Sequence, residues 1–104
     1  MDYKVYVTDD AYADLDGCIY YLLFVKKNEQ AARSVMQDFE ETKKRLALVA
    51  GSIKECSDHR LRELGYRRIN FQSHRYFMLY RIKGDIVVVD NIFHELQDYQ
   101  NKMI

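Results

Sequence analysis

The second half of the sequence concentrates side chains that can bind an anion and move protons. Residues 54–83 carry 8 Lys and Arg against 3 Asp and Glu, a net charge of +5, while residues 1–53 sum to −2 and residues 84–104 to −3. The planar guanidinium of arginine binds phosphate oxygens in pairs, and histidine, tyrosine or a carboxylate can transfer protons. These residue types suit metal-free chemistry at a phosphate. The candidates are Arg67, Arg68, Arg75, Arg81, His74, His94 and Tyr99.

Strand alternation predicts how some of these candidates are arranged. In an extended segment, Arg75 and Arg81 share a face with Phe77 and Leu79, and the intervening residues occupy the other face. The two arginines are six residues apart, about 20 Å along a strand, so one phosphate can hardly touch both.

Structural roles compete with the chemical ones. The arginines suit solvated or ion-paired surface positions, and His94 suits a hydrogen-bonded structural histidine that closes the last strand. His59 and His74 suit plain loop positions.

The first half of the chain has the pattern of one strand and two helices. Residues 3–7 alternate as a short strand, Thr8 suits a helix N-cap, and Asn28 suits a second one. Gly51 is expected to cap the end of the second helix, and Glu40 is expected to pair with Lys44 on its outer side. The apolar positions of the two helices are Ala11, Leu15, Cys18, Ile19, Leu22, Leu23 and Val25, then Ala32, Val35, Met36, Phe39, Leu46 and Val49.

The second half has the pattern of strands. Residues 52–65 show no period and are expected to connect the helices to the sheet. Strands are predicted around residues 66–71, 76–82 and 86–89, with turns at Ser73–His74 and at Lys83-Gly84-Asp85. The order β-α-α-β-β-β predicts an α+β fold in which an antiparallel helix pair packs on one face of a small antiparallel sheet. The first strand and the Ile69–Phe71 strand are the expected edges.

Composition narrows the class of protein. The chain has 104 residues, 48% of them apolar and 31% charged, and no proline, which predicts one domain spanning residues 1–104. No apolar run reaches the length of a membrane span, and no basic-then-apolar leader is visible. Two cysteines 38 positions apart match no zinc spacing, so we expect a cytoplasmic protein without metal or cofactor.

The order of these pieces resembles the RelE/ParE superfamily of type II toxin–antitoxin toxins over nearly the whole chain. The closing segment, from Ile92 to Tyr99, is similar to the Ile-x-His-x-x-x-Asp-Tyr ending common among these toxins. The other pieces that carry the resemblance are Tyr3-Lys4-Val5, Asp14-Leu15, Ile19-Tyr20-Tyr21-Leu22, Gly65-Tyr66-Arg67-Arg68-Ile69 and the strand His74–Ile82.

The resemblance implies a small toxin that an antitoxin holds inactive. RelE-like members bind the ribosomal A site and cut mRNA there without a metal, whereas ParE-like members inhibit DNA gyrase and cut no RNA. The sequence favours a toxin that blocks translation as a ribosome-dependent, metal-free mRNA endoribonuclease. The alternatives are a ParE-like toxin that inhibits gyrase without nuclease activity, and a non-toxic member that only binds its antitoxin. Growth inhibition and plasmid stabilisation are the roles expected of such a system. The implied partners are the antitoxin, and then either the ribosome with its mRNA or gyrase.

As an endoribonuclease, the chain would use Arg75, His94 and Arg68 in catalysis. Arg67, Arg81, Lys54 and Tyr99 would bind the RNA or another target. One departure from the family pattern bears on this assignment, because RNA-cutting relatives place an arginine three residues before the tyrosine that is Tyr80 here, and this chain has Phe77. The zero net charge also contrasts with the basic character expected of a ribosome binder.

Overall fold

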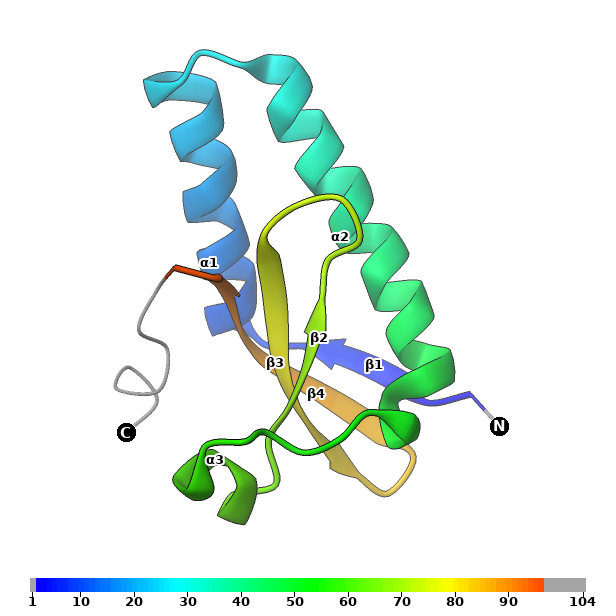
Figure 1. The fold of residues 1–104 in the computed structure, drawn as a ribbon. Helices are drawn as coiled ribbons and strands as arrows, with labels where there is room; N and C mark the ends of the chain where they lie inside the picture. The colour runs from blue at the N-terminus through cyan, green and yellow to red at the C-terminus, as the bar shows by residue number, and fades with distance from the viewer. Residues whose placement is uncertain (1, 97–104) are drawn as a thin grey trace.

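The fold is a helical hairpin packed on one face of a four-stranded sheet, with a short third helix against the opposite face (Figure 1). The computed structural model describes residues 2–96, and residue 1 and residues 97–104 lie outside the described part. The predicted α+β class and the order β-α-α-β-β-β are confirmed. Within the described part, no helix is long and apolar enough to cross a bilayer.

The sheet is mixed, although the sequence predicts antiparallel pairing throughout. Its strands are β1 (Lys4–Val7), β2 (Arg67–Asn70), β3 (Tyr76–Lys83) and β4 (Ile86–His94), in the spatial order β1-β4-β3-β2. β4 pairs antiparallel with β3 and parallel with β1. Because the two helices run out and back, β2 starts at the same end of the sheet as β1, and two reversals then leave β4 parallel to β1. β1 and β2 are the edges, as expected.

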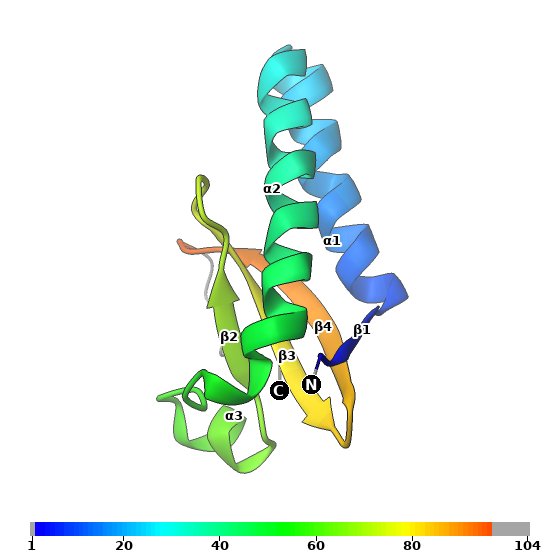
Figure 2. The ribbon, with the colours of Figure 1, turned by 90° about the vertical axis from the view of Figure 1, so that its right-hand side faces the viewer.

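The helices begin at the predicted caps. Thr8 accepts a hydrogen bond from the backbone of Ala11 at the start of α1 (Asp9–Tyr20), and Asn28 accepts one from Ala31 at the start of α2 (Glu29–Val49). A π-helical turn, Tyr21–Val25, continues α1 to the tip of the hairpin. Figure 2 shows that this tip extends beyond the sheet.

The overhanging tip explains two wrong predictions about the core. Val25 is 60% exposed and Met36 is 40% exposed, although the helical period places both on the apolar faces. The sheet ends before it reaches them, and the π-helical turn rotates Val25 away from the preceding face.

Three further details differ from expectation. The connection between α2 and β2 contains a helix, α3 (His59–Glu63), which Asp58 caps; five residues are too few to show a period. Gly51 lies in a 3-10 turn (Ala50–Ser52) after α2 rather than capping it. Glu40 pairs with Lys43 at 3.9 Å, the i,i+3 alternative to the predicted i,i+4 partner.

The sheet is apolar on both faces. The helix face, meaning the face that packs against α1 and α2, contributes Ile69, Met78, Tyr80, Val87, Val89 and Ile92 to the main core. The α3 face contributes Phe77, Leu79 and Phe93, which pack with Leu61 of α3 and Cys56. Tyr80 is fully buried and its hydroxyl donates to the carbonyl of Ala50 at 2.9 Å, and burial raises the pKa of Tyr80 to about 12.

A β-bulge in β4 decides which side chains reach each face. Tyr80 pairs with Val89 and Leu79 pairs with Asn91, so Asp90 is an extra residue with no opposite partner. The extra residue reverses the alternation of β4. Val89 before the bulge and Ile92 after it therefore both face the helices.

The N-cap residue Thr8 and Asp14 in α1 hold this bulge in place. The hydroxyl of Thr8 donates to the carbonyl of Asp90 at 3.0 Å. The carboxylate of Asp14 accepts from the side chain of Asn91 at 3.1 Å and from the backbone of Ile92 at 2.9 Å. The start of α1 thus fixes the position of the last part of β4.

Candidate functional site

The sheet separates the predicted catalytic residues. Arg68 projects on the α3 face, where its guanidinium lies 3.8 Å from the centre of the Phe77 ring. His94 projects on the helix face, in edge contact with Tyr76 at 5.2 Å between ring centres. Arg75 is exposed just before β3. The described residues therefore do not bring Arg75, His94 and Arg68 to one surface.

Lys54 and Arg68, both predicted as site residues, do share one hollow on the α3 face. The hollow has a volume of about 280 Å³, and its lining is Lys54, Glu55, Cys56, Ser57, Arg68 and Asn70. The Nε atom of Arg68 donates to the side-chain oxygen of Asn70 at 3.1 Å. Two cationic side chains beside two neutral polar ones can bind a phosphate or carboxylate, although Glu55 offsets one of the charges.

Cys56 in this hollow is a poor nucleophile. Burial raises the pKa of the Cys56 thiol, and the nearby charge of Arg68 only partly opposes this effect. Since the thiolate is the reactive form of cysteine, the hollow is suited to binding rather than to covalent chemistry.

Arg81 is already paired. Its guanidinium donates to the carboxylate of Asp90 through two contacts of 2.7 and 3.3 Å, and it lies over the ring of Tyr66. The hydrogen bonds that Arg81 donates to Asp90 raise the pKa of Arg81 above its ordinary value. The bulge presents this carboxylate, so the charge expected to bind RNA is neutralised within the fold.

Arg67 has a structural contact on the helix side of the sheet edge. Its guanidinium donates to the carbonyls of Gly51 and Ile53 at 3.2 and 2.7 Å. These hydrogen bonds join β2 to the end of α2. Arg67 and Arg68 are neighbours in β2, and their side chains therefore make contacts on opposite faces of the sheet.

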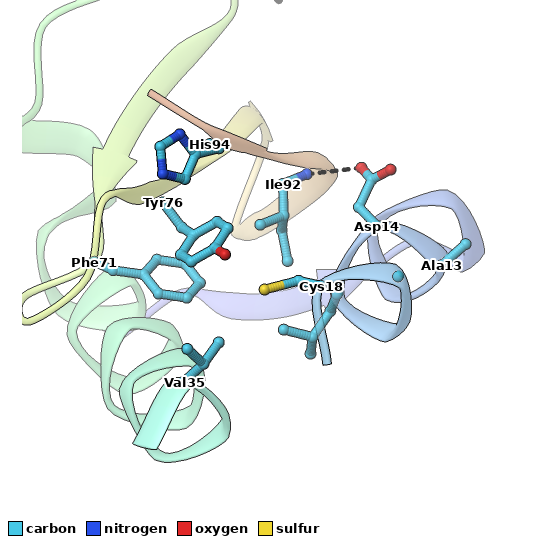
Figure 3. A pocket seen from close by; sticks show the side chains of 10 residues that line it. Ala13, Asp14, Cys18, Val35, Phe71, Tyr76, Ile92 and His94 are labelled. Atoms are coloured by element: carbon cyan, nitrogen blue, oxygen red, sulfur yellow. Dashed lines mark hydrogen bonds between the residues drawn. The ribbon is translucent and has the colours of Figure 1, made fainter. Parts of the chain in front are cut away.

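His94 lines a cavity together with Tyr76, Cys18 and Asp14 (Figure 3). The Nδ1 atom of His94 accepts from the backbone of Leu96 at 3.1 Å, in line with a structural histidine at the end of the last strand. Burial raises the pKa of Tyr76 far above its ordinary value, and burial likewise raises the pKa of Cys18. Both groups stay protonated and polar at neutral pH.

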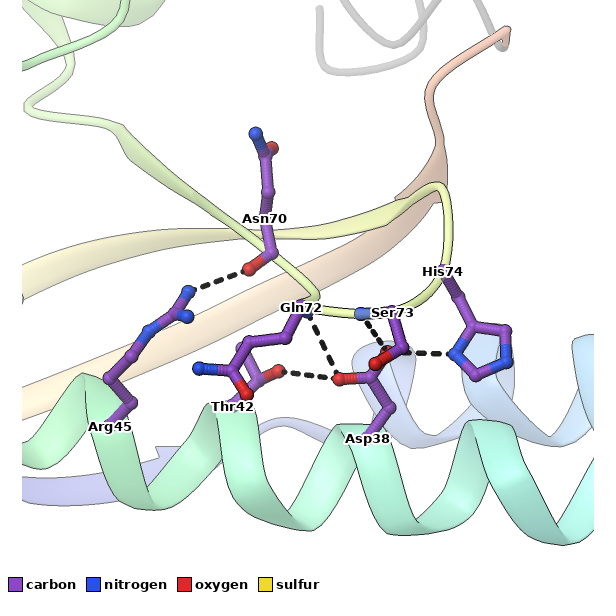
Figure 4. Close-up of polar contacts among 7 residues, drawn as sticks. All are labelled: Asp38, Thr42, Arg45, Asn70, Gln72, Ser73 and His74. Carbon is purple, nitrogen blue, oxygen red and sulfur yellow. Dashed lines mark hydrogen bonds and ion pairs between the residues drawn. The ribbon is translucent and has the colours of Figure 1, made fainter.

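A buried carboxylate that the sequence reading missed fixes the β2–β3 loop. Asp38 of α2 accepts from the backbones of Gln72 and Ser73 at 3.1 and 2.9 Å and from the Nδ1 atom of His74 at 2.7 Å (Figure 4). Burial opposes ionisation of Asp38, but the hydrogen bonds outweigh it and lower the pKa of the carboxyl below its usual range. Next to it, Arg45 donates to the carbonyl of Asn70 at 2.8 Å.

One signal in the sequence points to this network. Asp38 stands directly before Phe39 and three residues after Val35, so the helical period places an acidic residue beside the apolar face. Its partner His74 lies in a loop, as the sequence predicts, but its side chain is held by the hydrogen bond to Asp38.

The tip of the hairpin exposes a cluster of large apolar side chains. Tyr20 and Phe24 are in ring contact at 4.7 Å, and Phe24 is 63% exposed. Tyr21 and Val25, which adjoin these residues in the chain, are exposed as well. Contiguous exposed apolar side chains mark surfaces that bind other proteins.

The described residues offer no cluster of three His, Cys, Asp or Glu side chains that could hold a metal ion.

Comparison with known families decides the identity of the chain. The family model described as the ParE toxin of the type II toxin–antitoxin system parDE matches residues 5–99. The chain belongs to the ParE toxin family. Among the described residues of this ParE-family toxin, the match begins one residue into β1 and includes the whole of every later strand and helix.

Solved structures share the fold of this ParE-family toxin. A chain from the chromosomal ParDE toxin–antitoxin system of P. aeruginosa aligns with a TM-score of 0.70 at 23% identity, covering 88% of this chain and 95% of that one. A chain of the toxin–antitoxin complex RelBE2 from Mycobacterium tuberculosis aligns with a TM-score of 0.57 at 20% identity, covering 90% and 99%. A search of curated proteins finds no match.

One predicted binding residue of this ParE-family toxin lies outside the described residues. Tyr99, together with Asp98 of the closing motif, falls within residues 97–104. The assignment of Tyr99 to target binding stays a prediction.

Proposed function

We propose that this ParE-family toxin inhibits DNA gyrase by binding it and does not cut mRNA. The observation that carries the proposal is the separation of the candidate catalytic residues. Arg68 lies on the α3 face and His94 on the helix face, whereas metal-free cleavage needs a base, an acid and a phosphate-binding cation around one bond.

The charges of the chain support the same proposal. The net charge is zero, and Arg81 and Arg67, two of the expected RNA-binding residues, are bonded to Asp90 and to backbone carbonyls. Affinity for RNA depends strongly on unpaired cationic charge. Binding to a protein has no such requirement.

The hairpin tip offers a surface for a protein target. Aromatic side chains are over-represented among the residues that dominate protein–protein affinity. On the tip, Tyr20 and Phe24 are in ring contact, and both are exposed, as is Tyr21. We propose that this surface contributes to gyrase binding, and that the toxin acts in the cytoplasm, where gyrase is found.

A supercoiling assay with purified gyrase and relaxed plasmid tests the proposal. Micromolar toxin is expected to inhibit supercoiling, and Phe24→Ser at the tip is expected to need at least about tenfold more protein. Leu48→Ser is the matched control, because Leu48 is 64% exposed on α2 but lies outside the tip. Full gyrase activity in the presence of soluble wild-type toxin would contradict the proposal.

Ribosome-dependent cleavage is the second candidate, and one observation favours it. Lys54 and Arg68 converge on the polar hollow of the α3 face, which suits a phosphate. Primer extension on programmed ribosomes tests this function directly. Cuts at the A-site codon that disappear in Arg68→Ala would replace the gyrase proposal with this one.

The third alternative is a chain that is not toxic. If neither assay detects an effect and strong induction leaves growth unimpaired, the chain is a non-toxic member that binds only its antitoxin. Antitoxin binding itself fits all three functions. The edge of β1 can accept an added strand, and so can the edge of β2 beyond the bridge that Glu55 makes to Arg67.

A further inference from the structure

A cavity of about 370 Å³ lies between α1 and the end of the sheet where β3 begins and β4 ends (Figure 3). Its volume falls in the range of ligand-binding pockets, roughly 300–1,000 Å³. Val35 of α2 and Ile92 of β4 provide apolar walls. The cavity is separated by the sheet from the hollow that Lys54 and Arg68 share.

Three rings form one side of the cavity. Phe71 and Tyr76 lie 5.8 Å apart between ring centres, and Tyr76 meets the imidazole of His94 edge-on at an interplanar angle of 88°. Figure 3 shows the three rings gathered opposite α1. Faces of aromatic rings attract cations, and rings set at angles to one another form the cages that hold them.

The opposite side of the cavity carries a negative charge. The carboxylate of Asp14 is fixed at the rim by hydrogen bonds from Asn91 and Ile92. Among the residues that line the cavity, none is lysine or arginine. A carboxylate opposite aromatic rings, with apolar walls between them, complements a cation on an aliphatic stem.

The entrance can admit the main chain of a partner. Ala13 and Gly17 lie one helical turn apart on the exposed side of α1, and both line the cavity. A Cβ atom built on Gly17 would meet no other atom within 4 Å. A polypeptide can therefore approach α1 closely at this point.

We propose that this cavity receives a lysine or arginine side chain from a protein partner. The aliphatic stem lies along Val35 and Ile92, and the cationic head lies between the rings of Phe71, Tyr76 and His94 and the carboxylate of Asp14. This inference concerns the helix side of the sheet and does not depend on whether gyrase or RNA is the target.

Titrations of the full chain with small probes, followed by two-dimensional amide NMR, test the proposal. The cationic probe is N-acetyl-arginine amide; N-acetyl-citrulline amide has the same shape without the charge, and N-acetyl-norleucine amide is apolar. The arginine probe is expected to bind at least about fivefold more tightly than either neutral probe. The shifted amides are expected to include Gly17, Cys18 and Tyr76.

Three variants test whether the arginine probe binds in this cavity. Gly17→Leu places a bulky side chain at the entrance, where its Cβ atom meets open space, and is expected to abolish probe binding while the rest of the spectrum is kept. Asp14→Asn retains an oxygen that can accept from Ile92, so the fold is preserved, and it is expected to weaken arginine binding at least about fivefold. Asp16→Asn removes the same charge from the exposed surface of α1 outside the cavity and is expected to change binding less than twofold.

Three results would overturn the proposal. The first is norleucine amide binding as tightly as the arginine probe, because the cavity would then accept an apolar anchor. The second is spermidine binding more tightly than the arginine probe, which would point to a free polyamine instead of a protein side chain. The third is the absence of shifts at these amides at 50-fold molar excess of the arginine probe or more.

Discussion

Asp38 and His74 lie 2.7 Å apart across 36 positions of sequence, and their contact joins the middle of α2 to the tip of the β2–β3 hairpin. The carboxylate is nearly inaccessible, with a side chain that is 3% exposed. It also accepts from two consecutive backbone amides of the same loop. One side chain therefore fixes the polar tip of a loop whose first residue, Phe71, is anchored in the core.

Replacing this carboxylate is expected to destabilise the fold. Asp38→Asn puts an amide group, which donates, against backbone amides that also donate, and should lower the free energy of unfolding by about 2 kcal/mol. Urea denaturation at pH 7 measures the change. Glu40→Gln, an exposed change on the same helix, is the control and should stay within about 0.5 kcal/mol of wild type. Equal effects of the two changes would show that the network does not stabilise the fold.

The same network predicts a dependence on pH. The pKa of Asp38 is lowered from its ordinary value of 3.8, so the folded state favours the ionised carboxylate. Its stabilising contribution is therefore complete above about pH 4 and is lost as the pH falls through the lower pKa of the folded state. The difference in unfolding free energy between wild type and Asp38→Asn should shrink from pH 5 to pH 2.5. A difference that stays constant over this range would contradict the lowered pKa.

The pair of Arg81 and Asp90 is expected to show a measurable coupling. Both side chains are partly buried and joined by two hydrogen bonds, so a double-mutant cycle with alanine should give about 1 kcal/mol. The exposed pair of Arg33 and Glu29 on α2 is the comparison. That pair should give less than about 0.5 kcal/mol. A coupling near zero for Arg81 and Asp90 would leave Arg81 energetically available for a target.

Two glycine-to-alanine changes are expected to have opposite signs. A Cβ atom on Gly51 would lie 2.5 Å from the hydroxyl oxygen of Tyr3, whereas one on Gly17 meets open space within a helix. Gly51→Ala should destabilise the fold by about 1 kcal/mol, and Gly17→Ala should stabilise it by about 0.5–1 kcal/mol. Thermal unfolding followed by circular dichroism measures both.

A second substitution tests whether the hydroxyl of Tyr3 causes the destabilisation expected of Gly51→Ala. After Tyr3→Phe removes the hydroxyl, the next atom of the ring is 3.5 Å from the added Cβ, an ordinary contact. Gly51→Ala should therefore cost little in the Tyr3→Phe background. An unchanged cost in both backgrounds would locate the strain elsewhere.

Local patterns predicted most of the fold. Thr8 and Asn28 cap the helices as their residue types indicate, because a cap depends only on a side chain and amides within three residues. The order of the elements along the chain also predicted that β1 and β2 lie at the edges of the sheet. The parallel pairing of β1 with β4 was not predicted, since it depends on where the helical hairpin returns the chain.

The candidate site was less predictable. Alternation correctly put Phe77 and Leu79 on one face of β3, but it could not show which face meets the helices, because both are apolar. The partner of Arg81 depends on the bulge at Asp90, and a bulge has no reliable sequence pattern. The aromatic side of the cavity was not predicted either. Phe71, Tyr76 and His94 come from three separate segments of the chain and meet only in the folded sheet.

The parallel pairing of the first and last strands has a consequence for how the chain is made. Thr8 donates to the carbonyl of Asp90, 82 positions later, and β1 pairs only with β4, so β1 acquires its neighbour in the sheet only after β4 has left the ribosome. The bulge held by Asp14 and the cavity beside it form at the same late stage. We expect a nascent chain without β4 to be inactive against its target and unable to fill this cavity. Activity and susceptibility to a protein that binds there would then appear together, once β4 has been made.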